Sequence, residues 1–152
     1  QTVMQARPEI LNHNVETVPR LFKKVQPQDN FEWAKMVLCN ARGIDADVLT
    51  KSGIMVGLGE SMEEIKQTIS DIRSWGVNIL TVGQYLQPSR KHLPIERYYT
   101  MDEFDEIRSY AEEDLGFDWV ECAPLVRSSY HAERQVRMLS KLYKQLYKKD
   151  LD

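Results

Sequence analysis

Residues 48–64, which read VLTKSGIMVGLGESMEE, decide the fold class expected for this chain. Residues 48–58 are rich in β-branched and apolar side chains, a composition typical of a buried strand. Ser61 and Glu64 follow with the spacing of a capping box, in which each side chain accepts a hydrogen bond from the other residue's backbone amide. The stretch therefore predicts a strand that leads directly into a helix over residues 62–75.

The same unit, a strand followed by a helix, recurs on both sides of this stretch. A second capping box opens at Thr100. Trp33, Val37 and Ala41 lie on one stripe of another helix, which Gly43 is expected to end. Strands are expected at residues 8–14, 48–58, 77–85 and 118–123, and helices at residues 31–42, 62–75, 101–115 and 133–149.

This alternation predicts an α/β fold with parallel strands joined by right-handed crossovers. In the helix at residues 62–75, Ile65, Ile69 and Ile72 share one face and are expected to pack on the sheet. Parallel sheets need cover on both faces, and this chain has few helices to provide it. Two architectures stay open at this point: a compact doubly wound domain, or one half of a (β/α) barrel.

Composition narrows the class of protein. The chain has 152 residues, which suits one domain, and its 42% hydrophobic and 28% charged residues favour a soluble globular protein. A net charge of −3 gives no basic field for nucleic acid, and no apolar run reaches the roughly 18 residues of a membrane span. Cys39 and Cys122 form no C-x-x-C pattern, so we expect buried thiols in a reducing compartment.

Polar residues follow each predicted strand, where ligands bind in parallel α/β folds. A shared pocket is therefore expected, although Asn residues such as Asn12 and Asn14 also bond their own backbone in turns. Gly57 and Gly59 permit positive φ and a close approach to a ligand, with helix amides open to an anionic group; a plain tight turn is the alternative. The candidates at the strand ends are Asn12, Asn14, Glu16, Gly57, Gly59, Gln84, Arg127, Ser128 and Ser129.

Two further segments are candidates for function. Arg127 beside two hydroxyls can orient an oxyanion, but no Ser-His-Asp order accompanies it, which argues against a serine nucleophile. Residues 84–94 form a long loop with a basic pair, which is suited to covering the pocket or meeting an acidic partner; a solvated loop is the alternative. The basic end of the chain is interpreted as a solvated helix rather than a membrane or nucleic-acid surface.

The strand-end segments together resemble lipoyl synthase, a family of radical S-adenosylmethionine (SAM) enzymes. Four long stretches occur in the family's order, and the helices between them are also similar. The stretches are NHNVETVPRL at residues 12–21, TKSGIMVGLGE at 50–60, LTVGQYLQPSRKHLP at 80–94 and PLVRSSYHA at 124–132.

The resemblance implies a partial (β/α) barrel that binds two [4Fe-4S] clusters and SAM. In the family, a radical derived from SAM abstracts hydrogen from C6 and C8 of an octanoyl chain, which is carried by a lipoyl carrier protein or domain. The auxiliary cluster supplies both sulfur atoms. The resemblance thus implies sulfur insertion as the activity and an octanoylated carrier as the partner, with neither nucleic acid nor membrane involved.

The resemblance also assigns roles to single residues. Ser128 is implied as the fourth ligand of the auxiliary cluster, with Ser129 as the alternate and Arg127 next to that site. Residues 53–60 match the family's adenine-supporting G-x-I-x-G-x-x-E strand, with Met55 in place of the usual isoleucine. The residues implied near SAM or the substrate are Asn12, Asn14, Glu16, Lys51, Ser52, Gly57, Gly59 and Gln84.

One departure from the family is large. Its cysteine triplets, C-x4-C-x5-C and C-x3-C-x2-C, do not occur in this sequence. We therefore expect the C-terminal half of such an enzyme, with residues 1–132 in the barrel, residues 133–152 as a terminal helix, and the N-terminal half elsewhere in the same protein.

On this interpretation, the isolated chain is expected to be inactive, because clusters need several thiolates. The alternative is a non-catalytic four-strand module for an acyl carrier or nucleoside. Oxygen-sensitive clusters indicate the bacterial cytoplasm or a mitochondrial or plastid matrix.

Overall fold

The computed structural model describes residues 2–28, 30–129, 133–135 and 137–138. These residues contain a four-stranded sheet with the strand order β1-β2-β3-β4, and every neighbouring pair is parallel. The predicted alternation of parallel strands and helices is confirmed. The strands are β1 (Ile10–Asn12), β2 (Leu49–Val56), β3 (Ile79–Gln84) and β4 (Trp119–Cys122).

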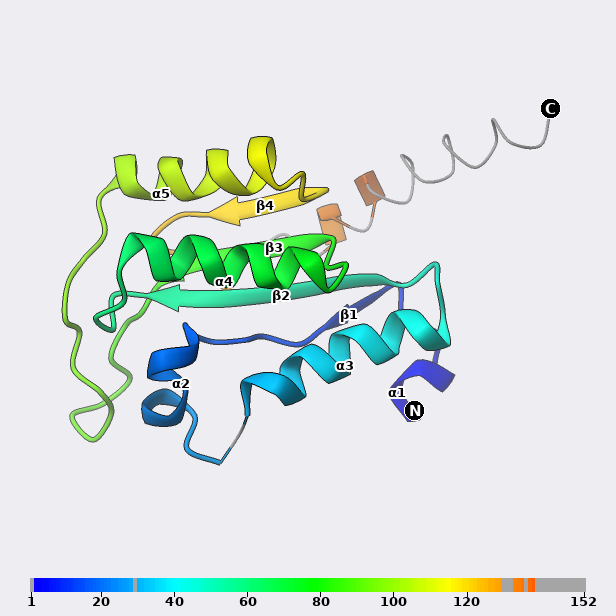
Figure 1. The fold of residues 1–152 in the computed structure, drawn as a ribbon, viewed down its shortest axis with the longest axis horizontal. Coiled ribbons are helices and arrows are strands. Elements are labelled where there is room, and N and C mark those ends of the chain that lie inside the picture. The colour runs from blue at the N-terminus through cyan, green and yellow to red at the C-terminus, as the bar shows by residue number, and fades with distance from the viewer. Residues whose placement is uncertain (1, 29, 130–132, 136, 139–152) are drawn as a thin grey trace.

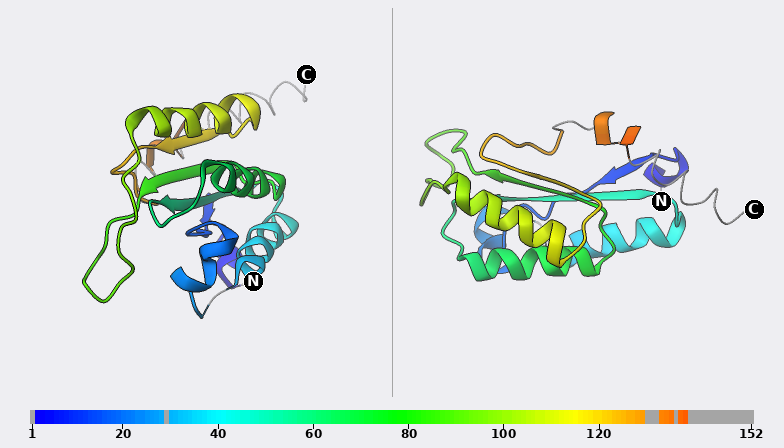
Figure 2. Two further views of the ribbon diagram at one scale, coloured as in Figure 1. Left: turned by 60° about the vertical axis from the view of Figure 1, so that its left-hand side comes forward. Right: turned by 90° about the horizontal axis from the view of Figure 1, so that it is seen from above.

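The helices decide between the two architectures left open by the sequence. Figure 2 shows α3, α4 and α5 on one side of the sheet and the helical residues 133–135 and 137–138 on the other. A doubly wound fold reverses its strand order and covers both faces with helices, whereas a (β/α) barrel keeps sequential order and places the helices outside. This chain has the half-barrel arrangement. The helices are α1 (Thr2–Gln5), α2 (Pro19–Val25), α3 (Phe31–Ile44), α4 (Met62–Ser74) and α5 (Met101–Ser109), which continues into the π-helical turn η1 (Tyr110–Asp114).

Local sequence signals set the ends of α4 and α5. Ser61 Oγ accepts from the Glu64 amide at 3.3 Å, and Glu64 Oε2 accepts from the Ser61 amide at 2.9 Å, so the predicted capping box of α4 is confirmed. Thr100 opens α5 with the same reciprocal pattern. Gly76 follows α4 with a φ of 84°, a conformation that glycine adopts without a steric penalty.

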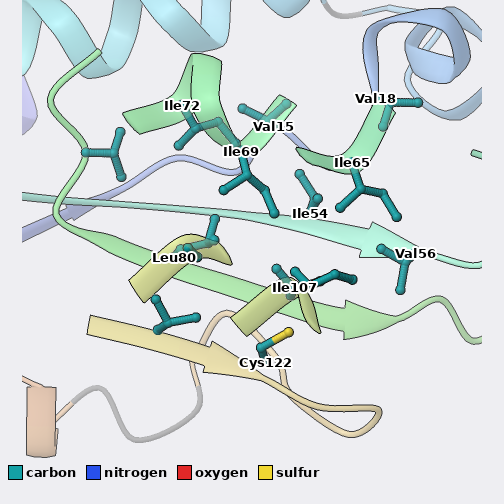
Figure 3. Close-up of a cluster of buried hydrophobic side chains, with 14 of the residues drawn as sticks. Val15, Val18, Ile54, Val56, Ile65, Ile69, Ile72, Leu80, Ile107 and Cys122 are labelled. Atoms are coloured by element: carbon teal, nitrogen blue, oxygen red, sulfur yellow. The ribbon is translucent and has the colours of Figure 1, made fainter. Parts of the chain in front are cut away.

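The core lies between the sheet and the helices, as Figure 3 shows. Ile65, Ile69 and Ile72 of α4 are fully buried, as their spacing predicted, and they face the apolar side chains of β2 and β3. Burying one such side chain stabilises the fold by about 1.5–3 kcal/mol. The packing of α4 on β2 and β3 therefore holds the strands in place. It also determines which side chains of the strands point away from the helices.

The predicted helix at residues 31–42 is confirmed as α3, but only part of its predicted stripe is buried. Ala41 is buried, whereas Trp33 is 54% exposed and Val37 is 38% exposed. The buried residues are Ala34, Leu38 and Ala41, which also have helical spacing, so periodicity alone did not separate the two sets. The helix also continues past Gly43 to Ile44. Helix α2, which starts with Pro19 in its first turn, was not predicted.

The predicted helix over residues 133–149 is described only in part. Residues 133–135 and 137–138 are helical, whereas residue 136 and residues 139–152 lie outside the described part of the chain, with most of the proposed segment 133–152. In the part that is described, none of the helices is both long enough and apolar enough to span a bilayer.

Candidate functional site

The sheet face opposite α3, α4 and α5, here called the inner face, carries small and polar side chains beside an apolar cluster at the start of the strands, which consists of Ile10, Leu49, Ile79 and Trp119. Paired residues of parallel strands point to the same side, so the strand register identifies this set. Asn12 pairs with Lys51, and Lys51 pairs with Ile79; Gly53 pairs with Thr81, and Thr81 pairs with Glu121. The inner face therefore provides hydrogen-bonding groups where the opposite face provides a core.

Two cavities open along the inner face. The first, of about 200 Å³, lies at the carboxyl ends of the strands, and the second, of about 410 Å³, extends toward the start of β1. Ser128 lines both cavities. The first also includes Asn14, Glu16, Met55, Thr81, Gln84 and Arg127, and the second includes Glu9, Asn12, Lys51, Ser129, Glu133 and Gln135.

The segment after β1 lines the first cavity in a strained conformation. It stays beside β2, because the Val15 amide donates to Gly53 O at 3.1 Å and the Met55 amide donates to Glu16 O at 2.8 Å. Glu16 has a φ of 73°, a left-handed conformation. For any residue other than glycine, this conformation lowers the stability of the fold by on the order of 1–3 kcal/mol. Such strain is concentrated at functional sites, and here it sets the course of the backbone beside the cavity.

Asn14 presents a buried acceptor with no hydrogen-bond partner to this region. Its Oδ1 is one of three buried side-chain oxygen or nitrogen atoms without a partner among the described residues. Leaving such an atom unpaired costs about 1–3 kcal/mol, which a ligand that donates a hydrogen bond would recover. A donor such as an amino or hydroxyl group of a nucleoside fits this acceptor.

The turn at residues 127–129, here called the RSS turn, follows β4 across the inner face. The Gln84 amide donates to Pro124 O at 3.2 Å, which ties the approach of the turn to β3. Arg127 Nη1 donates to the Val126 carbonyl at 2.6 Å and to the Pro124 carbonyl at 3.4 Å, and among the described residues the Nε and Nη2 donors are available to an anionic ligand. Ser128 is half-buried between the cavities, whereas Ser129 is exposed. Tyr130 lies outside the described residues.

The glycine turn after β2 has the backbone conformation expected of it. Gly57 and Gly59 have φ values of 108° and 101°, so the positive φ is confirmed. The prediction that the amides at the start of α4 receive an anionic group stays a prediction, but two amides of the turn itself are taken by Glu60. Its carboxylate accepts from the Gly57 amide at 2.5 Å and from the Leu58 amide at 2.9 Å.

Gln84 and Tyr99 hold the loop between β3 and α5 against this turn. Gln84 Oε1 accepts from the Tyr99 amide at 3.0 Å, and Gln84 Nε2 donates to Arg97 O at 3.0 Å. Tyr99 donates its hydroxyl to Glu60 O at 3.2 Å, and burial raises the pKa of Tyr99 to about 12. Gln84 is among the residues that line the first cavity, and its side-chain amide is already bonded to protein partners.

Most of the predicted site residues come together, but three do not line either cavity. Ser52, Gly57 and Gly59 are absent from both walls, and Ser52 alternates with Lys51 and Gly53, so it faces the helices. Those that do line a cavity are Asn12, Asn14, Glu16, Lys51, Gln84, Arg127, Ser128 and Ser129.

Sequence reasoning missed some residues of the cavity walls. Thr81 and Gly83 alternate along β3, and this period of two was a usable signal for the inner face. Gln135 carried no such signal, because only the tertiary structure brings it to Lys51.

The thiols of this chain do not fit an iron–sulfur cluster. Cys39 is exposed on α3, contrary to the expectation of burial. Cys122 is buried on the helix side of β4, where its Sγ donates to Phe104 O at 3.2 Å and burial raises its pKa to about 12. Within the described ranges, no group of three His, Cys, Asp or Glu side chains could hold a metal ion. Any cluster at Ser128 needs thiolates from another segment.

Comparison with known proteins places these observations in a family context. No family model matches the chain. Lipoyl synthase of Rubrobacter xylanophilus is 54% identical over 135 residues, which cover 89% of this chain and 42% of that protein. Lipoyl synthases of Photobacterium profundum and Pectobacterium atrosepticum are 52% and 50% identical, covering 87% and 86% of this chain and 41% and 40% of their own lengths. The chain spans about two fifths of these curated relatives, and over most of its own length it is homologous to the lipoyl synthases.

Proposed function

We propose that this chain is the C-terminal part of a lipoyl synthase, which inserts two sulfur atoms at C6 and C8 of a protein-bound octanoyl chain. Residues 1–132 then form half of the barrel, and an octanoylated lipoyl carrier protein or domain is the partner. The observation that carries the proposal is the convergence of Asn14, Glu16, Arg127 and Ser128 on one cavity, in a chain homologous to lipoyl synthases. We place the enzyme in a reducing compartment, the cytoplasm of a bacterium.

The first cavity provides one wall of a nucleoside site. Bound SAM supplies the radical that abstracts hydrogen from the octanoyl chain. The Asn14 Oδ1 accepts a hydrogen bond from the ligand, and the Arg127 guanidinium pairs with a carboxylate. At about 200 Å³ the cavity is smaller than the roughly 300–1,000 Å³ of complete ligand pockets, so the opposite wall must come from other residues.

Ser128 is the hydroxyl that we propose as a ligand of the auxiliary cluster, with Ser129 as the alternate. An oxygen ligand is harder than a thiolate and suits a position that must exchange during the reaction. Ser128 lines both cavities, whereas Ser129 lines only the second, which favours Ser128. The clusters themselves belong to residues outside this sequence, because its two cysteines do not line either cavity.

A chimera tests the proposal. This chain would be joined to the part of the Rubrobacter xylanophilus lipoyl synthase that precedes the matched residues, and reconstituted anaerobically with iron and sulfide. We expect the chimera to have a [4Fe-4S] absorption band and to form lipoyl groups on an octanoylated carrier, and the isolated chain to do neither. Ser128→Ala should abolish lipoyl formation, while the matched Ser129→Ala should retain it. A chimera that folds with full clusters and converts no carrier would contradict the proposal.

A further inference from the structure

Lys51 is buried on the inner face near the start of β2, and its side chain reaches a distant part of the chain. It is 2% exposed, and its Nζ donates to Oε1 of Gln135 at 2.9 Å. Gln135, 84 positions further along the chain, is itself fully buried. Figure 2 shows the helical residues 133–135 and 137–138 on the side of the sheet away from α3, α4 and α5. The bond therefore joins the first half of β2 to the segment that follows the RSS turn.

The other end of the RSS turn is held by β3. The Ala123 amide donates to Val82 O at 3.1 Å, and the Gln84 amide donates to Pro124 O at 3.2 Å. Gly83 leaves room for the Val126 carbonyl oxygen, which a side chain at that position would strike. Ser128 thus lies between two points where the chain is fixed to the sheet.

We propose that Lys51 and Gln135 form a latch that positions the RSS turn over the two cavities. The inference rests on the proposed function, because Ser128 can serve as a ligand only if its hydroxyl is held in one place. Lys51 acts through Gln135 and the turn, and it is therefore a positioning residue. Both latch residues also line the second cavity, which Ser128 shares with the first.

Burying the charged group of Lys51 is unfavourable for folding. This argues that Lys51 serves to position the RSS turn and not to stabilise the fold. Burial lowers the pKa of Lys51, and the carboxylate of Glu121 on β4 opposes this effect only in part. Replacing a buried charged group by apolar atoms of similar volume is often neutral or stabilising. Methionine has nearly the length of lysine, so it would fill the space equally well. It lacks the donor that fixes Gln135.

Thiol labelling separates the two roles. The full chain would carry Cys39→Ser, to remove the exposed thiol, and Ser128→Cys, whose new side chain serves as the reporter thiol of the turn. Cys122, which is 1% exposed in the core, reports global unfolding in the same molecule. The test variants are Lys51→Met and Gln135→Met. The matched control is Lys66→Met, which removes an exposed lysine whose Nζ lies 2.7 Å from Glu106.

The latch predicts that both test variants label the reporter thiol at least about tenfold faster, as expected for the loss of a charged hydrogen bond. Cys122 labelling and the melting temperature should match those of Lys66→Met, and the double variant should label no faster than either single one. Unchanged labelling of the reporter thiol in Gln135→Met would overturn the inference. So would a parallel rise at Cys122, which would mean that Lys51 only stabilises the fold. Because labelling needs neither cluster nor substrate, a failed chimera would leave this result intact.

Discussion

The two faces of the sheet differ in what they contribute. On the helix side, the strands present Ile54, Val56, Leu80 and Val82, all 4% exposed or less, and these pack on α4 and α5 (Figure 3). On the inner face, the same two strands begin with the buried apolar side chains of Leu49 and Ile79 and then present Lys51, Gly53, Met55, Thr81 and Gly83. Beyond that first apolar pair, adjacent residues of one strand belong either to a core that stabilises the fold or to a site. In the site, polar atoms and close backbone approach replace apolar burial.

The inner face carries three local costs of the structure, and the helix side carries another, the buried hydroxyl of Ser52, which has no partner among the described residues. Asn14 has a buried oxygen without a partner among the described residues, Glu16 has a positive φ, and Lys51 is a buried ammonium group. Each lowers stability unless something else compensates for it. The helix side has a compensating core of isoleucine, leucine and valine. The comparison therefore predicts large stability losses from the helix side and losses of positioning from the inner face.

Truncating the helix-side core should have the largest effect. Leu80→Ala removes a fully buried side chain of β3 and should lower the free energy of unfolding by about 2–5 kcal/mol, measured by urea denaturation. The control is Leu86→Ala, which truncates a 44% exposed leucine of the first cavity and should cost about 1 kcal/mol or less. Equal losses in the two variants would remove the distinction between the faces.

A smaller effect is expected where the inner face needs glycine. Gly83→Ala places a methyl group against the Val126 carbonyl oxygen and should lower the free energy of unfolding by about 1–3 kcal/mol, because the turn must move. Gly43→Ala is the matched control, since a methyl group meets nothing within 4 Å there and a helix favours alanine over glycine by up to about 1 kcal/mol. If Gly83→Ala were as stable as wild type, the RSS turn would not be tightly seated on β3.

The smallest effect is expected from a surface pair of the helix layer. A hydrogen bond from Arg20 lowers the pKa of Glu64 to about 2. The pair therefore stabilises the folded chain above pH 4.5, the unfolded value, and the contribution is lost as the pH falls toward 2. The side chains are 56% and 30% exposed, so solvent screens the pair and we expect a smaller effect than for either substitution in the sheet.

The measurement compares wild type with Arg20→Gln by urea denaturation at two pH values. The difference in unfolding free energy should be present at about pH 6 and fall by about half or more at about pH 3. A difference that grows at the lower pH would contradict the assigned cause of the pKa shift. If Arg20→Gln lowered the free energy of unfolding by as much as Leu80→Ala, the surface charges, and not the core, would distinguish the helix side.

Local signals explain which elements were predicted well. The capping boxes at Ser61 and Thr100 were readable because they involve residues three positions apart. The strands could be predicted because their apolar runs are bounded by residues that favour turns. The register of α3 could not be predicted, because Trp33 and Ala34 both start stripes of helical spacing, and only contact with the sheet decides which stripe is buried.

In the candidate site, too, some features could be predicted from the sequence and others could not. The strand-end residues Asn14, Glu16, Arg127 and Ser128 were predicted as a group, because the carboxyl ends of parallel strands meet at one edge. Ser52 was misplaced by one step of the strand alternation, which puts it on the helix side. The use of the Gly57 and Leu58 amides by Glu60 depends on the shape of a turn that the glycines permit but do not dictate.

The amino-acid sequence by itself determined the alternation of strands and helices, their capped ends, the edge where polar residues gather and the resemblance to lipoyl synthases. These features depend on neighbours in the chain. Only the tertiary structure decided that the helices cover one face of the sheet, that Ser128 lies between two cavities, and that Lys51 meets Gln135. Contacts between residues far apart in the chain depend on packing of the whole sheet, and no local pattern encodes them.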